Sequence, residues 1–70
     1  MVPQRIWRLK KLHQAVDAEL LVFNESQIDV RFLFNGALSY VRSCGSRQEA
    51  LAEAAAKRAE MEREGWAFHW

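Results

Sequence analysis

An Asn-Gly pair near the middle of the chain, Asn35-Gly36, separates two runs rich in β-branched, aromatic and aliphatic residues. A type I′ turn needs positive φ at both of its central residues, and Asn and Gly tolerate that region better than other residues do. The pair therefore predicts a two-residue hairpin that joins strands at about residues 27–34 and 37–43.

The segment before this hairpin predicts further strands. Residues 15–23 have the composition of a strand, and the polar residues Asn24–Gln27 suit a turn into the next one. Residues 5–12 are ambiguous, and they favour an additional edge strand because lysines suit a solvent-exposed edge.

A helix is predicted at about residues 47–64. Ser46 followed by Glu49 has the spacing of a capping box, in which each side chain accepts from an otherwise unpaired backbone N–H of the other. The residues that follow are rich in alanine and contain no Gly or Pro until Gly65, which suits a left-handed helix end. The apolar side is expected to comprise Ala50, Leu51, Ala54, Ala55 and Met61.

These elements fit a single domain. At 70 residues, the chain buries only about 60% of the surface that its unfolded form exposes, which leaves no room for a large enclosed active site. We expect an α+β fold, a three- or four-stranded antiparallel meander with one C-terminal α-helix packed on one face. The aromatic tail at residues 66–70 is expected to seal the core or to pair with a sheet edge.

Counting outward from the hairpin assigns the central side chains to two faces. In this register Arg31 opposes Tyr40, and Asp29 opposes Arg42. The face expected beneath the helix contains Ile28, Val30, Phe32, Phe34, Ala37 and Val41. The uncovered face is expected to contain a candidate binding surface formed by Arg31, Leu33, Leu38, Tyr40 and Arg42. Arg and Tyr are enriched in interface hot spots, but the same residues also form cross-strand ion pairs, with Asp17 or Glu19 neutralising the arginines.

Charge is distributed unevenly although the net charge is only +1. The first 14 residues contain basic residues and no acid, and they supply the candidate phosphate contacts Arg5, Arg8, Lys10 and Lys11. The near-neutral total and the nearby acids favour a protein partner over a nucleic acid.

No residue pattern for catalysis or metal binding stands out. The chain lacks a Gly-rich phosphate loop, a zinc-protease motif, a paired-cysteine motif and a nucleophile elbow. His13, His69 and Cys44 have no metal-site spacing, and Cys44 suits a small apolar plug better than a reactive thiol. We therefore expect no enzyme, no cofactor, no metal and no small-molecule substrate. No apolar run is long enough for a membrane span or an export signal, which favours a cytoplasmic location.

Two resemblances arise from these segments. The stretches Phe32–Tyr40, Ser46–Leu51 and Glu64–Trp66 look like a group of small uncharacterised bacterial proteins, which implies a bacterial source. The order strand, Asn-Gly turn, strand and Ser-x-x-Glu-Ala helix is similar to the arm-type DNA-binding domains of tyrosine recombinases. That second resemblance implies a sheet face that enters the major groove, with Arg31, Tyr40 and Arg42 on it.

The leading hypothesis from the sequence is a small non-enzymatic interaction module. It would bind a protein partner or a second copy of itself through the open sheet face or an edge, because so small a domain gains apolar burial by association. The alternative is a nucleic-acid-binding module that uses the Arg/Tyr face and the basic N-terminal segment.

Overall fold

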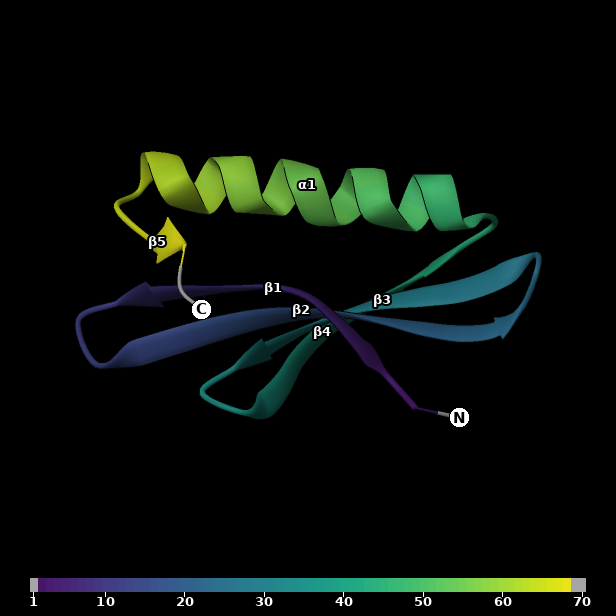
Figure 1. The fold of residues 1–70 in the computed structure, drawn as a ribbon, viewed down its shortest axis with the longest axis horizontal. Coiled ribbons are helices and arrows are strands. Elements are labelled where there is room, and N and C mark those ends of the chain that lie inside the picture. Colours follow the sequence, from purple (N-terminus) through teal and green to yellow (C-terminus); the bar gives the residue numbers. More distant parts are fainter. Residues whose placement is uncertain (1, 69–70) are drawn as a thin grey trace.

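The computed structural model describes residues 2–68, and it is an α+β fold with one antiparallel sheet and one helix (Figure 1). The sheet has the strand order β4-β3-β2-β1-β5. The elements are β1 (Gln4–Lys11), β2 (Gln14–Asn24), β3 (Gln27–Phe34), β4 (Ala37–Cys44), α1 (Arg47–Arg63) and the two-residue β5 (Ala67–Phe68). The predicted fold class is confirmed, and the N-terminal segment is a strand.

The central hairpin has the predicted turn. Asn35 and Gly36 have φ values of 52° and 84°, so both residues occupy the left-handed region that a type I′ turn requires. Asn35 also reaches β2, because its side-chain Oδ1 accepts from the Ala15 N–H at 2.9 Å and its own N–H donates to the Ala15 carbonyl at 2.8 Å. The turn therefore holds the start of β2 as well as joining β3 to β4.

The helix ends follow the sequence signals closely. Ser46 Oγ accepts from the Glu49 N–H at 3.1 Å, whereas the Glu49 carboxylate accepts from Gly45 N–H, one residue before the expected donor. At the other end, Gly65 has a φ of 99°, and the Trp66 N–H donates to the Met61 carbonyl at 3.1 Å. This arrangement is a Schellman motif.

One face of the sheet and one side of α1 form the core. Trp7, Leu9, Val16, Ala18, Leu20, Ile28, Val30, Phe32, Cys44, Ala50, Ala54 and Met61 are buried. Ala50 and Ala54 are fully buried, so α1 lies close to the strands. Leu51 was expected in this interface, but it is 40% exposed because it lies at the flank of the stripe formed by Ala50, Ala54 and Met61.

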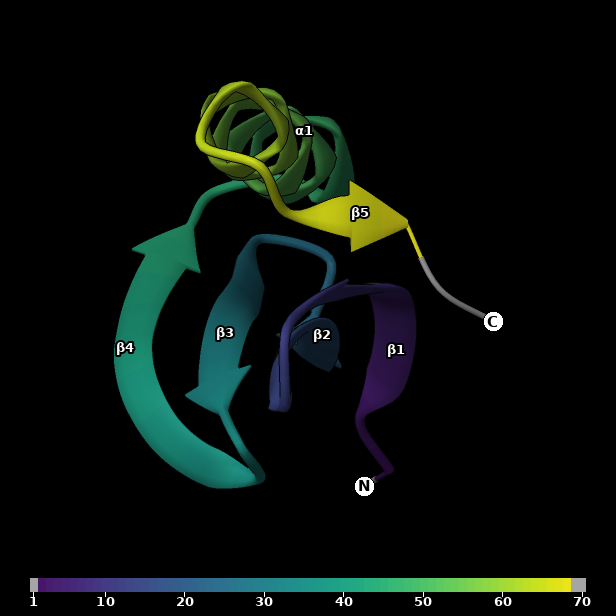
Figure 2. The same ribbon diagram turned by 90° about the vertical axis from the view of Figure 1, so that its left-hand side faces the viewer.

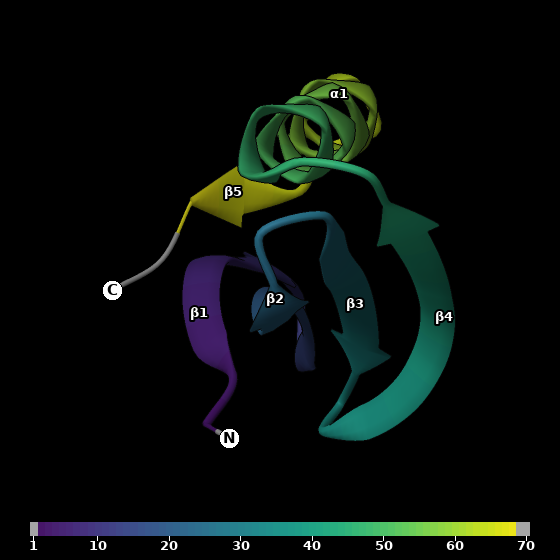
Figure 3. The ribbon, with the colours of Figure 1, turned by 90° about the vertical axis from the view of Figure 1, so that its right-hand side faces the viewer.

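The second face of the sheet remains uncovered. Figures 2 and 3 show α1 over one side of the sheet, with the edge strand β5 close to it, and no other segment of residues 2–68 covers the opposite side. β5 pairs with β1, and Trp66 packs against the core with its ring centroid 6.3 Å from that of Phe34. The start of the aromatic tail thus both closes the core and pairs with an edge, while His69 and Trp70 lie outside the described residues.

Candidate interaction surface

A β-bulge at Ser39 changes which side chains of β4 share a face. Leu33 opposes Leu38, but the next residue of β3, Phe32, opposes Tyr40. Ser39 is therefore an extra residue, and every later β4 side chain changes sides relative to simple counting from the turn.

Two of the five candidate residues do not lie on the face that was predicted for them. Arg31, Leu33 and Leu38 lie on the open face, whereas Tyr40 and Arg42 lie on the side of α1. The Tyr40 ring stacks on Phe32 with centroids 6.0 Å apart, and the Arg42 guanidinium lies 3.6 Å from the Glu53 carboxylate of α1.

Val41 lies on the open face rather than on the helix side that was predicted for it. It was expected beneath the helix, but it opposes Arg31 on the open face and is 42% exposed. Together with Leu33 and Leu38 it forms what we call the open-face patch. Leu38 is 53% exposed, so this patch is an apolar surface beside the free edge of the sheet.

Charged side chains of β1, β2 and β3 on the open face neutralise one another. Arg8 donates to the two carboxylate oxygens of Asp17 at 2.6 and 3.0 Å, and this hydrogen-bonded ion pair lowers the pKa of Asp17. Arg31 lies 4.0 Å from the Glu19 carboxylate, which is an ion pair but too long for a hydrogen bond. The buried Nε of Arg31 has no hydrogen-bond partner among the described residues.

Two of the four candidate phosphate contacts are already bound to other groups of the chain. Arg8 is bound to Asp17, and Lys11 Nζ donates to the Glu64 carbonyl at the end of α1 at 2.8 Å. A cation at this position stabilises a helix because it compensates the negative end of the helix dipole. Arg5 and Lys10 are exposed on the same face of β1 as Arg8, whereas Lys11 points toward α1, so the four side chains do not share one surface.

β1 and the short β5 form one edge of the sheet, and β4 forms the other, which we call the free edge. The order of strands places it outermost, and Figures 2 and 3 show no other element beyond it among residues 2–68. All of its residues except Cys44 are exposed. Tyr40 is 49% exposed despite its contact with Phe32. An edge of this kind presents unpaired backbone N–H and C=O groups together with apolar side chains.

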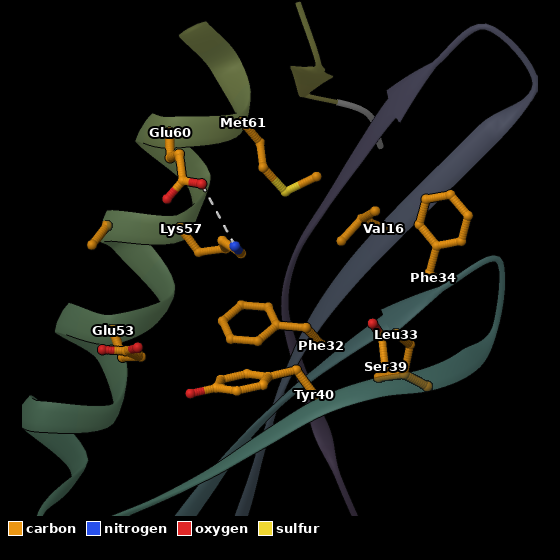
Figure 4. Close-up of a pocket in the computed structure, with 11 residues that line it drawn as sticks. Val16, Phe32, Leu33, Phe34, Ser39, Tyr40, Glu53, Lys57, Glu60 and Met61 are labelled. Atoms are coloured by element: carbon orange, nitrogen blue, oxygen red, sulfur yellow. Dashed lines mark ion pairs between the residues drawn. The ribbon is translucent and has the colours of Figure 1, made fainter. Parts of the chain in front are cut away.

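A groove of about 480 Å³ lies between α1 and the β3–β4 hairpin (Figure 4). Its lining combines aromatic and aliphatic side chains of the sheet with charged side chains of the helix. The lining residues are Val16, Phe32, Leu33, Phe34, Ser39, Tyr40, Glu53, Ala56, Lys57, Glu60 and Met61. Figure 4 shows the Lys57–Glu60 ion pair, 3.7 Å long, above the Phe32 ring. The groove adjoins β4 through Tyr40, so the two features form one continuous surface.

The remaining chemistry of the described residues is limited. Cys44 is buried next to the helix start, and burial raises the pKa of its thiol, which keeps it in the less reactive protonated form. Within residues 2–68, no three His, Cys, Asp or Glu side chains are grouped so that they could hold a metal ion. The helix that the structure describes is not long and apolar enough to cross a bilayer.

Comparison with protein-family models, with curated proteins and with solved structures found no match to this chain. The features that bear on its function are therefore the geometry of β4, the open-face patch and the groove.

Proposed function

We propose that this chain is a small non-enzymatic interaction module that binds another polypeptide as an added strand along β4. The observation that supports this proposal is the exposure of β4 itself, where only Cys44 is buried. In strand addition, backbone hydrogen bonds along a free edge supply affinity, and pockets for alternate side chains supply specificity.

The surroundings of β4 provide such sites on both sides of an added strand. Side chains that point toward α1 would contact the groove, whose floor includes Phe32 and Tyr40 and whose rim includes Glu53. Side chains that point the other way would contact the open-face patch. We therefore expect bound peptides to alternate apolar residues with aromatic or basic ones.

The charge arrangement favours a polypeptide over a nucleic acid. Tyr40 and Arg42 lie on the opposite side of the sheet from Arg31, so they do not form one reading surface with it. Arg8 is already neutralised by Asp17. A nucleic-acid backbone needs several free cations on one surface, because neutralised phosphates supply most of the affinity.

Selection from a displayed library of short random peptides tests the proposal. Peptides that bind the wild-type chain should bind Val41→Lys at least about tenfold more weakly, because lysine on an edge strand opposes strand addition. Leu51→Lys is the matched control, since Leu51 is 40% exposed and Val41 is 42% exposed, but Leu51 lies on α1. Failure to enrich any peptide, or equal binding by both variants, would show that β4 is not the binding edge.

A further inference from the structure

The second half of β4 has few of the features that protect sheet edges. The bulge at Ser39 precedes this part, and from Tyr40 to Cys44 the strand pairs with β3 in regular register. Its only charged residue is Arg42, whose guanidinium is paired with Glu53. Natural edges are usually blocked by proline, by several charges or by bulges, so Tyr40–Cys44 is a segment open to another strand.

We propose that a second copy of this chain occupies this edge, with the two β4 strands antiparallel about a two-fold axis at Val41. This inference rests on the strand addition proposed above and names the partner. Val41 then opposes the partner's Val41, and Tyr40 opposes the partner's Arg42 on both sides of the axis. An axis perpendicular to the sheet produces one continuous sheet with both helices on the same face.

Charge complementarity selects this register. Tyr40 is 49% exposed, so the partner's Arg42 meets an accessible aromatic ring, and a guanidinium over such a ring is attracted to its face. The Glu53 carboxylate, which pairs with Arg42 of its own chain at 3.6 Å, keeps that guanidinium on the side of the sheet where Tyr40 lies. A two-fold axis at Arg42 instead places two guanidinium groups opposite each other, and like charges at that position are destabilising.

The open face is complementary as well. Val41 meets the partner's Val41 directly, and Leu38 lies further along the same strand, so the two open-face patches extend across the junction between the copies. A domain of this size gains stability from such burial because its own core is small. The contact is nevertheless limited in area, so we expect a weak dimer, with a dissociation constant on the order of 10 to 100 µM.

Disulfide trapping tests the position of the axis. The variant Val41→Cys, made with Cys44→Ala so that the new thiol is the only one, places each thiol opposite itself across the axis. Opposed residues in antiparallel strands have Cα atoms about 4.5 to 5.5 Å apart, which is within the range that a disulfide spans. Under mild oxidation, Val41→Cys should form a covalent dimer at least about tenfold faster than thiols that meet only by random collision.

Two matched variants in the same Cys44→Ala background are the controls. Leu51→Cys has similar exposure but lies on α1, and Arg42→Cys is one residue from the axis and opposes the partner's Tyr40. Both should cross-link slowly. Equal rates for all three variants, or a faster rate for Arg42→Cys, would overturn the proposed pairing. Circular dichroism of each variant checks that the fold is intact.

Light scattering of the unmodified chain provides an independent measurement. The mass should rise from 8.2 kDa toward twice that value as the concentration increases, and Val41→Lys should remain monomeric while Leu51→Lys follows the wild type. A wild-type chain that stays monomeric at about 1 mM, far above the expected dissociation constant, would exclude self-pairing. That result leaves strand addition by other polypeptides to be decided separately by the peptide selection.

Discussion

The indole Nε1 of Trp7 donates a hydrogen bond to the main-chain carbonyl of Ala54, 3.0 Å away, and both residues are buried. The bond joins residues 47 positions apart in the sequence and fixes the middle of α1 over β1. Ala54 lies within the helix, where its carbonyl is also placed to accept from the backbone N–H four residues later. The Ala54 carbonyl can therefore accept two hydrogen bonds, one from the helix backbone and one from the indole.

Trp7→Phe removes this donor and reduces the buried volume without introducing a polar group. We expect a loss of about 1–2 kcal/mol in the free energy of unfolding, because one hydrogen bond contributes about 1 kcal/mol and the smaller ring fills the site incompletely. Urea unfolding followed by far-ultraviolet circular dichroism measures the change. The same substitution at the half-buried Trp66 is the control, and an equal loss there would show that the Trp7–Ala54 bond has no particular role.

The alanines beneath α1 set the distance between helix and sheet. Ala54→Leu adds volume at a fully buried position, so we expect it to destabilise the fold by about 1–3 kcal/mol. Ala55→Leu, at the next residue, is exposed and should change stability by less than about 0.5 kcal/mol. Thermal unfolding of the two variants compares them directly. Equal effects would contradict the close packing of α1 on the strands at Ala54.

Local signals in the sequence were sufficient to predict the central hairpin and the helix, whereas they left residues 5–12 ambiguous. The hairpin, the helix start and the helix end each depend on two or three neighbouring residues, such as Asn35-Gly36 and Gly65, whose backbone preferences act without help from the rest of the chain. The four long strands and α1 therefore lie close to their expected ranges.

The faces of β4 could not be predicted in the same way. Counting from the hairpin assumes one residue opposite one residue, but the bulge at Ser39 places two residues of β4 opposite one of β3. Ser39 has no local signature of a bulge, because only the glycine-containing type of bulge calls for a particular residue. This single extra residue moved Tyr40 and Arg42 to the helix side and exposed Val41, so the candidate site changed while the fold did not.

The turn between β1 and β2 contains a strained residue. Leu12 has a φ of 57° and is 90% exposed, so it adopts a left-handed conformation without any burial to compensate. Leu12→Asn should stabilise the fold by about 0.5–1 kcal/mol, because asparagine tolerates this conformation. A rise of about 4 °C in the melting temperature is the corresponding shift for a domain of this size. His13→Asn is the control, and a similar gain there would show that the φ of Leu12 is not the cause.

The Arg8–Asp17 pair should make the free energy of unfolding depend on pH in the acid range. Its hydrogen bonds lower the pKa of Asp17 in the folded chain below the ordinary value of 3.8, so the unfolded chain binds a proton more readily. The contribution of the pair is therefore complete above about pH 5, and it is lost as the pH falls through 3.8 toward the folded-state pKa.

Asp17→Asn should flatten this part of the curve of unfolding free energy against pH, as measured by urea titration at a series of pH values. Arg8→Met removes the donor and should flatten the same region, and the double variant should show no further change. If the unfolding free energy of either single variant falls below pH 4 as steeply as that of the wild type, other carboxylates account for the acid sensitivity.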